Sequence, residues 1–165
     1  MKSRYLNSTG TIILLMLLGA FCSCQVGVHK DLVTGLKYNY HGLGVEDIVL
    51  TKDGETYRDN QFPAGSTVVM NFLGVSGFEK REGKVFPGLS VLVKDEAGAV
   101  VLQAEDLFSE YSVAGLDATQ ASELSSNLTI GDPMQQGAHY SWHITIWDKQ
   151  NDGLIEANMD FAVQP

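Results

Sequence analysis

Two histidines near the carboxyl terminus are the first residues whose types and spacing suggest chemistry. His139 and His143 alternate with apolar residues, which predicts a β-strand that carries both histidines on one face. On a strand they lie roughly 13 Å apart, whereas a zinc ion needs nitrogen ligands within about 2.1 Å. We therefore expect solvent-facing histidines and no metal site here. His29 and His41 have no partner that the sequence identifies.

Acidic loops are the next candidates for binding a cation. Residues 148–153 read Asp-Lys-Gln-Asn-Asp-Gly, but an EF-hand counted from Asp148 needs a bidentate Glu at its twelfth position, where this chain has Met159. A looser calcium site requires several acidic loops to converge at one end of the fold. Its candidate ligands are Asp53, Asp95, Glu96, Asp148 and Asp152. Because Asp is frequent in turns for conformational reasons alone, we predict no bound metal or cofactor.

Motifs for nucleophilic or acid–base catalysis are missing from the sequence. Residues 74–77, Gly-Val-Ser-Gly, are one residue short of a nucleophile elbow, and there is no HExxH motif and no phosphate-cradling glycine motif. The adjacent carboxylates Glu105 and Asp106 point to opposite faces of an extended chain, so they cannot act as a pair. We predict that the protein is not an enzyme. The alternative, a hydrolase of envelope polymers, needs His41 or His143 to meet a carboxylate across strands.

Aromatic residues near loops give the candidate binding surface, Trp147 and Tyr111. Tyr140 and Trp142 occupy the apolar positions of their strand and are predicted core residues, whereas Trp147 occupies a polar position beside the turn. Exposed aromatics near loops stack on sugars or anchor protein partners. The ordinary alternative is that a loop, or Met134 and its neighbours, covers Trp147.

The elements that position these residues are predicted to be short strands. Alternation over 139–147 and over 154–163, on either side of a turn, predicts a terminal β-hairpin. The Asp53-Gly54 turn predicts a second hairpin of strands at 46–51 and 55–57, and residues 95–98 predict a third, of strands at 89–94 and 99–103. Turn signals place further strands at 36–40, 66–75 and 125–130. Half-polar strands are typical of antiparallel sheets with one solvated face. We predict an all-β, antiparallel, immunoglobulin-like β-sandwich of seven or eight strands, with a small closed barrel as the alternative.

Two segments depart from the alternating pattern. Asp117 is followed three residues later by Gln120, a capping-box arrangement, so we predict one short crossover helix over 117–124. Residues 78–88 are charged and contain glycine, which predicts a long exposed loop.

The amino-terminal residues predict export. Lys2 and Arg4 precede an apolar run over 12–21, about half of what a membrane-spanning helix needs, so the segment is typical of a secretory signal peptide. Residues 18–24, Leu-Gly-Ala-Phe-Cys-Ser-Cys, resemble the lipobox of bacterial lipoproteins. That resemblance implies cleavage before a cysteine that carries a diacylglycerol. Cys24 follows the small Ser23 and is the predicted lipidation site, whereas Cys22 follows the bulky Phe21.

Cysteine content and the residue after Cys24 extend this interpretation. The chain has only these two cysteines, so a chain cut before Cys24 retains no disulfide pair. In lipoproteins an Asp directly after the lipidated cysteine resembles an inner-membrane retention signal. This chain has Gln25 at that position, so the resemblance implies that the protein is located at the outer membrane. The predicted layout is a signal peptide over 1–23, a lipidated amino terminus and short tether over 24–35, and the β-sandwich domain over 36–165.

The net charge of the chain limits the kinds of molecule that it can bind. Eleven basic and 20 acidic residues give a net charge of −9, and the predicted cleavage removes two basic residues, so the mature chain carries 9 − 20 = −11. An acidic surface is repelled by nucleic acid and by anionic lipid headgroups. We therefore predict a non-catalytic envelope lipoprotein, held at the membrane by its lipid, that binds a protein or a glycan through its loops. The alternative to a binding function is a structural role, in which the protein is a component of an envelope assembly and pairs an edge strand with a neighbouring molecule.

Overall fold

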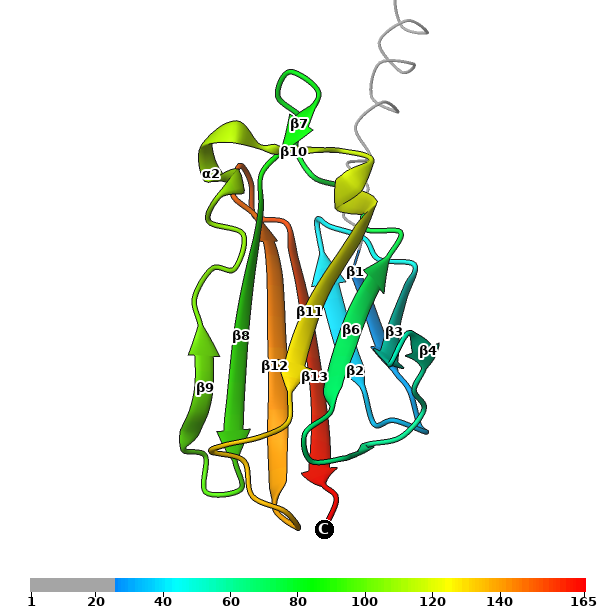
Figure 1. Ribbon diagram of the computed structural model, residues 1–165. Helices are drawn as coiled ribbons and strands as arrows, with labels where there is room; N and C mark the ends of the chain where they lie inside the picture. Colours follow the sequence, from blue (N-terminus) through cyan, green and yellow to red (C-terminus); the bar gives the residue numbers. More distant parts are fainter. Residues whose placement is uncertain (1–25) are drawn as a thin grey trace, which may run out of the picture.

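The computed structural model describes residues 26–165, which form a two-layer β-sandwich (Figure 1). The predicted signal peptide and the lipobox-like segment, with the predicted lipidation site Cys24, lie outside the described residues. The larger sheet has the order β1 (Val26–Lys30), β2 (Lys37–His41), β13 (Leu154–Val163), β12 (His139–Asp148), β8 (Pro87–Asp95) and β9 (Val100–Ala104). These pairings are antiparallel, and β5 (Gln61–Phe62) adds a short parallel pairing to the end of β13.

The second sheet covers the inner face of the first. Its order is β11 (Glu123–Thr129), β6 (Thr67–Leu73), β3 (Asp47–Lys52) and β4 (Glu55–Thr56). A two-stranded ribbon of β7 (Lys84–Val85) and β10 (Leu116–Asp117) lies at one end, together with the one-turn helix α2 (Tyr111–Ala114) and the 3-10 turn η1 (Gln120–Ser122) (Figure 1). Within residues 26–165 both sheets end in edge strands, so the predicted sandwich forms and the closed-barrel alternative does not. None of the helices described is long and apolar enough to cross a bilayer.

Alternation of apolar and polar residues builds the core. In β12 every second side chain from Tyr140 to Ile146 is buried, and Trp142 is completely inaccessible to solvent. In β6 the buried positions include Met70 and Phe72, which face the first sheet from the other layer. A buried apolar side chain of this size contributes roughly 1.5–3 kcal/mol. Because the inner face is filled in this way, the outer face of the larger sheet is left for polar side chains.

The predicted hairpins are confirmed. The terminal hairpin pairs β12 with β13 from His139 opposite Ala162 to Trp147 opposite Leu154. The hairpin of β3 and β4 turns at Asp53 and Gly54, whose φ values of 54° and 82° are the positive values that a two-residue hairpin turn requires.

The predicted crossover helix over 117–124 is wrong. That segment contains the end of β10, the 3-10 turn η1 and the start of β11. The carboxylate of Asp117 accepts a hydrogen bond from the Lys84 ammonium at 2.9 Å and does not cap a helix. Leu124 is buried at a strand position opposite Phe72, so packing in the second sheet overrides the local capping signal.

Two other segments are more ordered than predicted. The tether expected over 24–35 contains β1, which pairs along its whole length with β2. The loop expected over 78–88 buries Phe78 and Val85 and contains β7, so its exposed part is confined to the turn over 79–83.

Candidate binding site

The outer face of the larger sheet carries an ordered array of polar side chains. Cross-strand register aligns them in rows, and successive rows lie about 6.6 Å apart, two residues along a strand. In the strand order β2, β13, β12, one row consists of Asn39, Glu156 and Thr145, and the next consists of Lys37, Asn158 and His143. Edge strand β1 extends these rows with Val28 and Lys30.

A groove of about 450 Å³ crosses this face over β1, β2, β13 and β12. Small-molecule sites have volumes of about 300–1,000 Å³, so this groove is large enough for a ligand of that class. Its outward-facing side chains are those of Val28, Lys30, Lys37, Asn39, His143, Thr145, Glu156 and Asn158. All of these side chains except Val28 end in hydrogen-bonding groups, while most of the surface area that lines the groove is apolar.

Asn158 supplies the most informative atom of the groove. Its side-chain oxygen is shielded from solvent and has no hydrogen-bond partner among residues 26–165. A buried acceptor without a donor costs roughly 1–3 kcal/mol, and buried polar groups in proteins are seldom left unpaired. Lys37 on β2 and His143 on β12 lie directly opposite Asn158 on the neighbouring strands. Because this oxygen is shielded even from water, a ligand hydroxyl in the groove would reach it only after the Asn158 side chain turned outward.

His143 presents a neutral ring to the groove. Burial and the charge of Lys94 lower the pKa of His143 below its ordinary value of 6.5, and the charge of Asp160 only partly opposes them. The Nε2 atom lies 3.2 Å from the Ser141 hydroxyl. At neutral pH the imidazole therefore has one donor and one acceptor nitrogen, of which Nε2 is already paired with Ser141.

The acid–base contact required by the hydrolase alternative is not formed. Among the residues that the structure describes, no histidine makes a hydrogen bond or an ion pair with a carboxylate. His41 and His139 are exposed, and His29 stacks on Tyr38 with ring centroids 5.0 Å apart.

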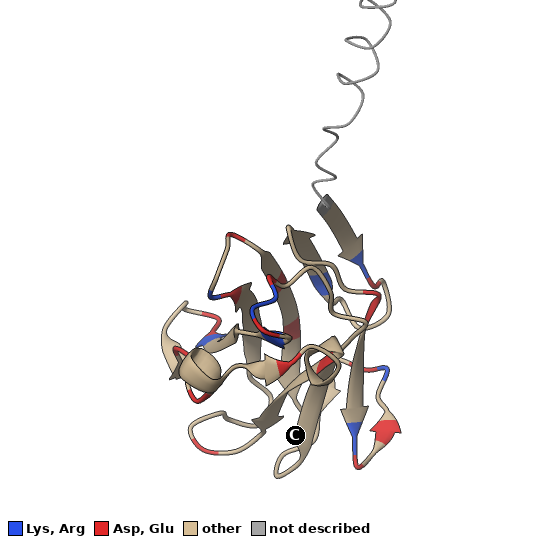
Figure 2. Ribbon diagram, turned by 90° about the horizontal axis from the view of Figure 1, so that it is seen from above, with Lys and Arg blue, Asp and Glu red and all other residues tan. Residues whose placement is uncertain are grey.

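The acidic loops do not converge on a cation site. Asp148 and Asp152 lie at one end of β12, whereas Asp95 is opposite Tyr140 near the other end, with Glu96 beside it. Asp53 forms an ion pair with Lys52 at 2.6 Å. Figure 2 shows Asp and Glu spread over several loops. Residues 26–165 contain no group of three or more His, Cys, Asp or Glu placed to hold a metal ion.

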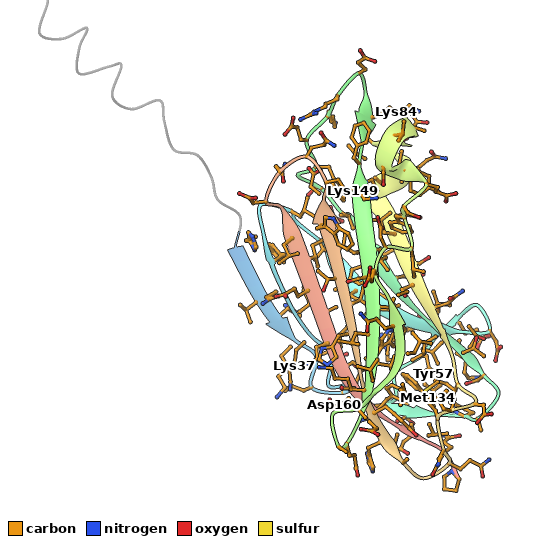
Figure 3. All side chains as sticks on the ribbon, turned by 90° about the vertical axis from the view of Figure 1, so that its left-hand side faces the viewer. Lys37, Tyr57, Lys84, Met134, Lys149 and Asp160 are labelled. Carbon is orange, nitrogen blue, oxygen red and sulfur yellow. The ribbon has the colours of Figure 1, made fainter. Side chains whose placement is uncertain are left out.

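Trp147 lies on the outer face of the larger sheet and is half-buried. Its ring covers Gly88, its direct partner on β8, so closely that a Cβ atom on Gly88 would lie 2.1 Å from the indole. Met134 does not cover it, because Met134 lies near the opposite end of the sandwich from Lys149, two residues beyond Trp147 (Figure 3). Trp147 does not line the groove.

Tyr111, the other residue of the predicted binding surface, begins α2. It is half-buried and packs edge-on against Phe108, with ring centroids 5.7 Å apart. The Lys149 ammonium ties this region to the end of β12, since it donates to the Phe108 carbonyl and to the Ser112 hydroxyl. Tyr111 does not line the groove either, so the two aromatic residues remain a predicted contact surface separate from it.

Sequence reasoning missed the groove residues on β1, β2 and β13. Glu156 and Asn158 were visible as the polar positions of an alternating strand, which predicts only a solvated face. Their importance depends on strand register, because Lys37 meets Asn158 only after β2 pairs with β13.

Comparisons with known proteins do not assign the chain to a family. No protein-family model matches it, and no curated protein matches its sequence. Its structure is similar to a crystal structure of the C-terminal domain of Wzt, with a TM-score of 0.48 and 10% sequence identity. The similarity covers 89% of this chain and 81% of the other. At that level it carries no information on a ligand.

Proposed function

We propose that this chain is a non-catalytic, lipid-anchored envelope protein that binds a glycan on the outer face of its larger sheet. The observation that carries the proposal is the groove and the cross-strand rows of hydrogen-bonding side chains in its lining, which include Asn39, Asn158 and His143. Sugar hydroxyls both donate and accept hydrogen bonds, as do the neutral His143 ring and the amides of Asn39 and Asn158. The groove is thus matched to a ligand rich in hydroxyl groups.

The composition of the groove favours a glycan over a protein partner. Protein–protein binding energy is concentrated in buried aromatic and arginine anchors. Of the outward-facing side chains in the groove, only Val28 is apolar, and none is aromatic or arginine. Glycan recognition by a row of amide, hydroxyl and carboxylate groups needs no such anchor. Trp147, one row beyond Thr145, lies where a longer glycan would meet an aromatic ring.

Glycan binding is tested with the full-length protein, solubilised in a zwitterionic detergent that has no sugar headgroup. The probe is a panel of immobilised bacterial surface oligosaccharides. We expect the wild type to bind at least one of them, and Asn158→Ala to weaken that binding roughly tenfold, since about 1.4 kcal/mol corresponds to a factor of ten.

The matched control is Asn127→Ala, which removes an exposed amide from the second sheet. It should bind like the wild type. Binding of no oligosaccharide by the wild type, or equal affinities of Asn158→Ala and wild type, would refute the proposal for this groove.

The lipid anchor is proposed at Cys24. Two or more acyl chains hold a protein at a bilayer stably, whereas one chain holds it only marginally. Expression of Cys24→Ser and Cys22→Ser variants with an alkyne-labelled fatty acid tests the site. The label should be lost from Cys24→Ser and kept by Cys22→Ser. The opposite pattern would move the anchor to Cys22, and labelling of both variants would exclude a single lipidated cysteine.

A further inference from the structure

We infer that the ligand of the groove is an acidic glycan, and that its carboxylate is held by Lys30 and Lys37. This inference rests on the proposed glycan binding. The two lysines face each other directly across β1 and β2, and both line the groove. Both are exposed, and neither forms an ion pair within the described part of the chain.

The placement of these lysines is unusual for this chain. Like charges directly opposite each other on neighbouring strands destabilise a sheet. Acidic residues outnumber basic ones by 20 to 11, so pairing a lysine with an acid would be the commoner arrangement. Residues 26–165 contain nine Lys and Arg, of which four are in ion pairs. Two of the remaining five are set against each other in the groove, where a bound anion would offset their repulsion.

The neighbours of the lysines define what kind of anion fits. Lys37 is the direct cross-strand partner of Asn158, so the cationic position adjoins the unpartnered acceptor oxygen. A uronic acid residue carries a carboxylate and several hydroxyls on one ring, so it offers an anion to the lysines and hydrogen-bonding groups to the neighbouring Asn158 and His143 side chains. A free inorganic anion would use the lysines alone.

Carboxylates on the same face restrict the anion to this position. Glu156 lies in the next row of the groove, and Asp160 follows Asn158 by one row on β13, on the same side of the molecule as Lys37 (Figure 3). Both repel an anion and accept hydrogen bonds from neutral hydroxyls. The groove therefore has a cationic part at β1 and β2 and an anion-repelling part along β13.

The test compares uronates with their uncharged esters. D-glucuronate and D-galacturonate, and the methyl ester of each, are titrated into the full-length protein and followed by saturation-transfer NMR. The wild type should bind the uronates at least about fivefold more tightly than the esters, the factor that roughly 1 kcal/mol of ion pairing gives. Added salt should weaken uronate binding and leave ester binding unchanged.

The variant that carries both Lys30→Gln and Lys37→Gln should lose this preference. Its melting temperature should equal or exceed that of the wild type, because the repulsion is gone, and this result separates loss of binding from loss of fold. Lys80→Gln, which removes one charge from the exposed turn at the end of the molecule, is the matched control and should keep the preference.

The outcomes separate this inference from the proposal beneath it. Equal binding of acids and esters, or a uronate preference that survives in the double variant, overturns the inference and leaves glycan binding intact. Uronates that do not bind while a neutral oligosaccharide occupies the groove likewise overturn the inference alone. If neither the monosaccharides nor any oligosaccharide binds, the proposed function fails as well.

Discussion

Replacement of Gly88 by Ala tests how the outer face of the larger sheet is held together. Gly88 lies under the ring of Trp147, and an added Cβ atom would lie 2.1, 2.3 and 2.6 Å from Cε2, Cζ2 and Nε1 of the indole. Ordinary contact begins at 3.4 Å, so the rigid ring must move by at least about 1 Å. The backbone of Gly88 has no positive φ, so Ala adds a steric conflict and no backbone strain.

The cost of this change follows from the packing. Overpacking costs roughly 1–3 kcal/mol, and the displaced ring also loses apolar contact with β8, so we expect about 2–3 kcal/mol in total. For a chain of this length about 1 kcal/mol lowers the melting temperature by roughly 2–4 °C. Gly88→Ala should therefore melt roughly 5–10 °C below the wild type.

The assay is thermal unfolding combined with NMR of the two indole N–H groups. Trp147 should shift strongly in Gly88→Ala, whereas the fully buried Trp142 should shift little. Gly131→Ala is the control, because Gly131 also lacks a positive φ and a Cβ atom there meets no neighbour within 4 Å. In a Trp147→Ala background the Gly88 substitution should cost almost nothing. An equal cost with and without the indole would refute the proposed packing.

Two further predictions concern buried and half-buried carboxylates. Asp106→Asn should destabilise the protein by roughly 1–2 kcal/mol at pH 7. Burial raises the pKa of Asp106, but the Lys149 ammonium and the N–H groups of Phe108 and Leu89 outweigh it and lower that pKa below its usual value. The stabilisation by Asp106 is complete above its unfolded pKa of about 3.9 and is lost as pH falls through the lower folded pKa. Plots of unfolding free energy against pH for Asp106→Asn and wild type should therefore converge in acid. Parallel plots would contradict this role of Asp106. Asp148→Ala should cost about 3 kcal/mol in urea unfolding, because the buried carboxylate accepts from Glu79 N at 2.6 Å and from Gln150 N at 2.9 Å. Asp148→Asn keeps one acceptor oxygen and should cost about half as much, so equal losses in the two variants would be evidence against this role.

Local signals explain why the hairpins were predictable. The turn at Asp53 and Gly54 and the ten-residue alternation of β12 and β13 each lie within a short stretch of sequence. The signal for a helix at Asp117 was equally local, and it was wrong because Leu124 packs in the second sheet opposite Phe72. A local signal therefore decides an element only where packing against distant residues does not override it.

The candidate site was not predictable for a related reason. Lys30, Lys37, Asn158 and His143 come from four strands, and their alignment in the groove depends on three separate strand pairings. The two pairings of β13 are specified by inner, apolar side chains, because a one-residue slip would turn the apolar set of a strand toward solvent. On the inner side of β1, His29 stacks on Tyr38 and Gly27 lies against the Tyr40 ring. The polar residues of the outer face are thus aligned by a core that they do not contact, and their own sequence pattern does not contain that alignment.

Strand β1 changes the relation between the groove and the proposed anchor. A flexible tether over 24–35 would let the domain move far from the bilayer, but β1 begins at Val26 and joins the larger sheet. A chain extends by at most about 3.6 Å per residue, so Lys30 lies no more than about 22 Å from Cys24. A lipid at Cys24 would therefore hold the groove close to the membrane surface. With the proposed anchor and the proposed ligand, the acidic glycans within reach would be those displayed near the bilayer, and a flexible insertion between Cys24 and Val26 should weaken their capture without changing the affinity for free uronate.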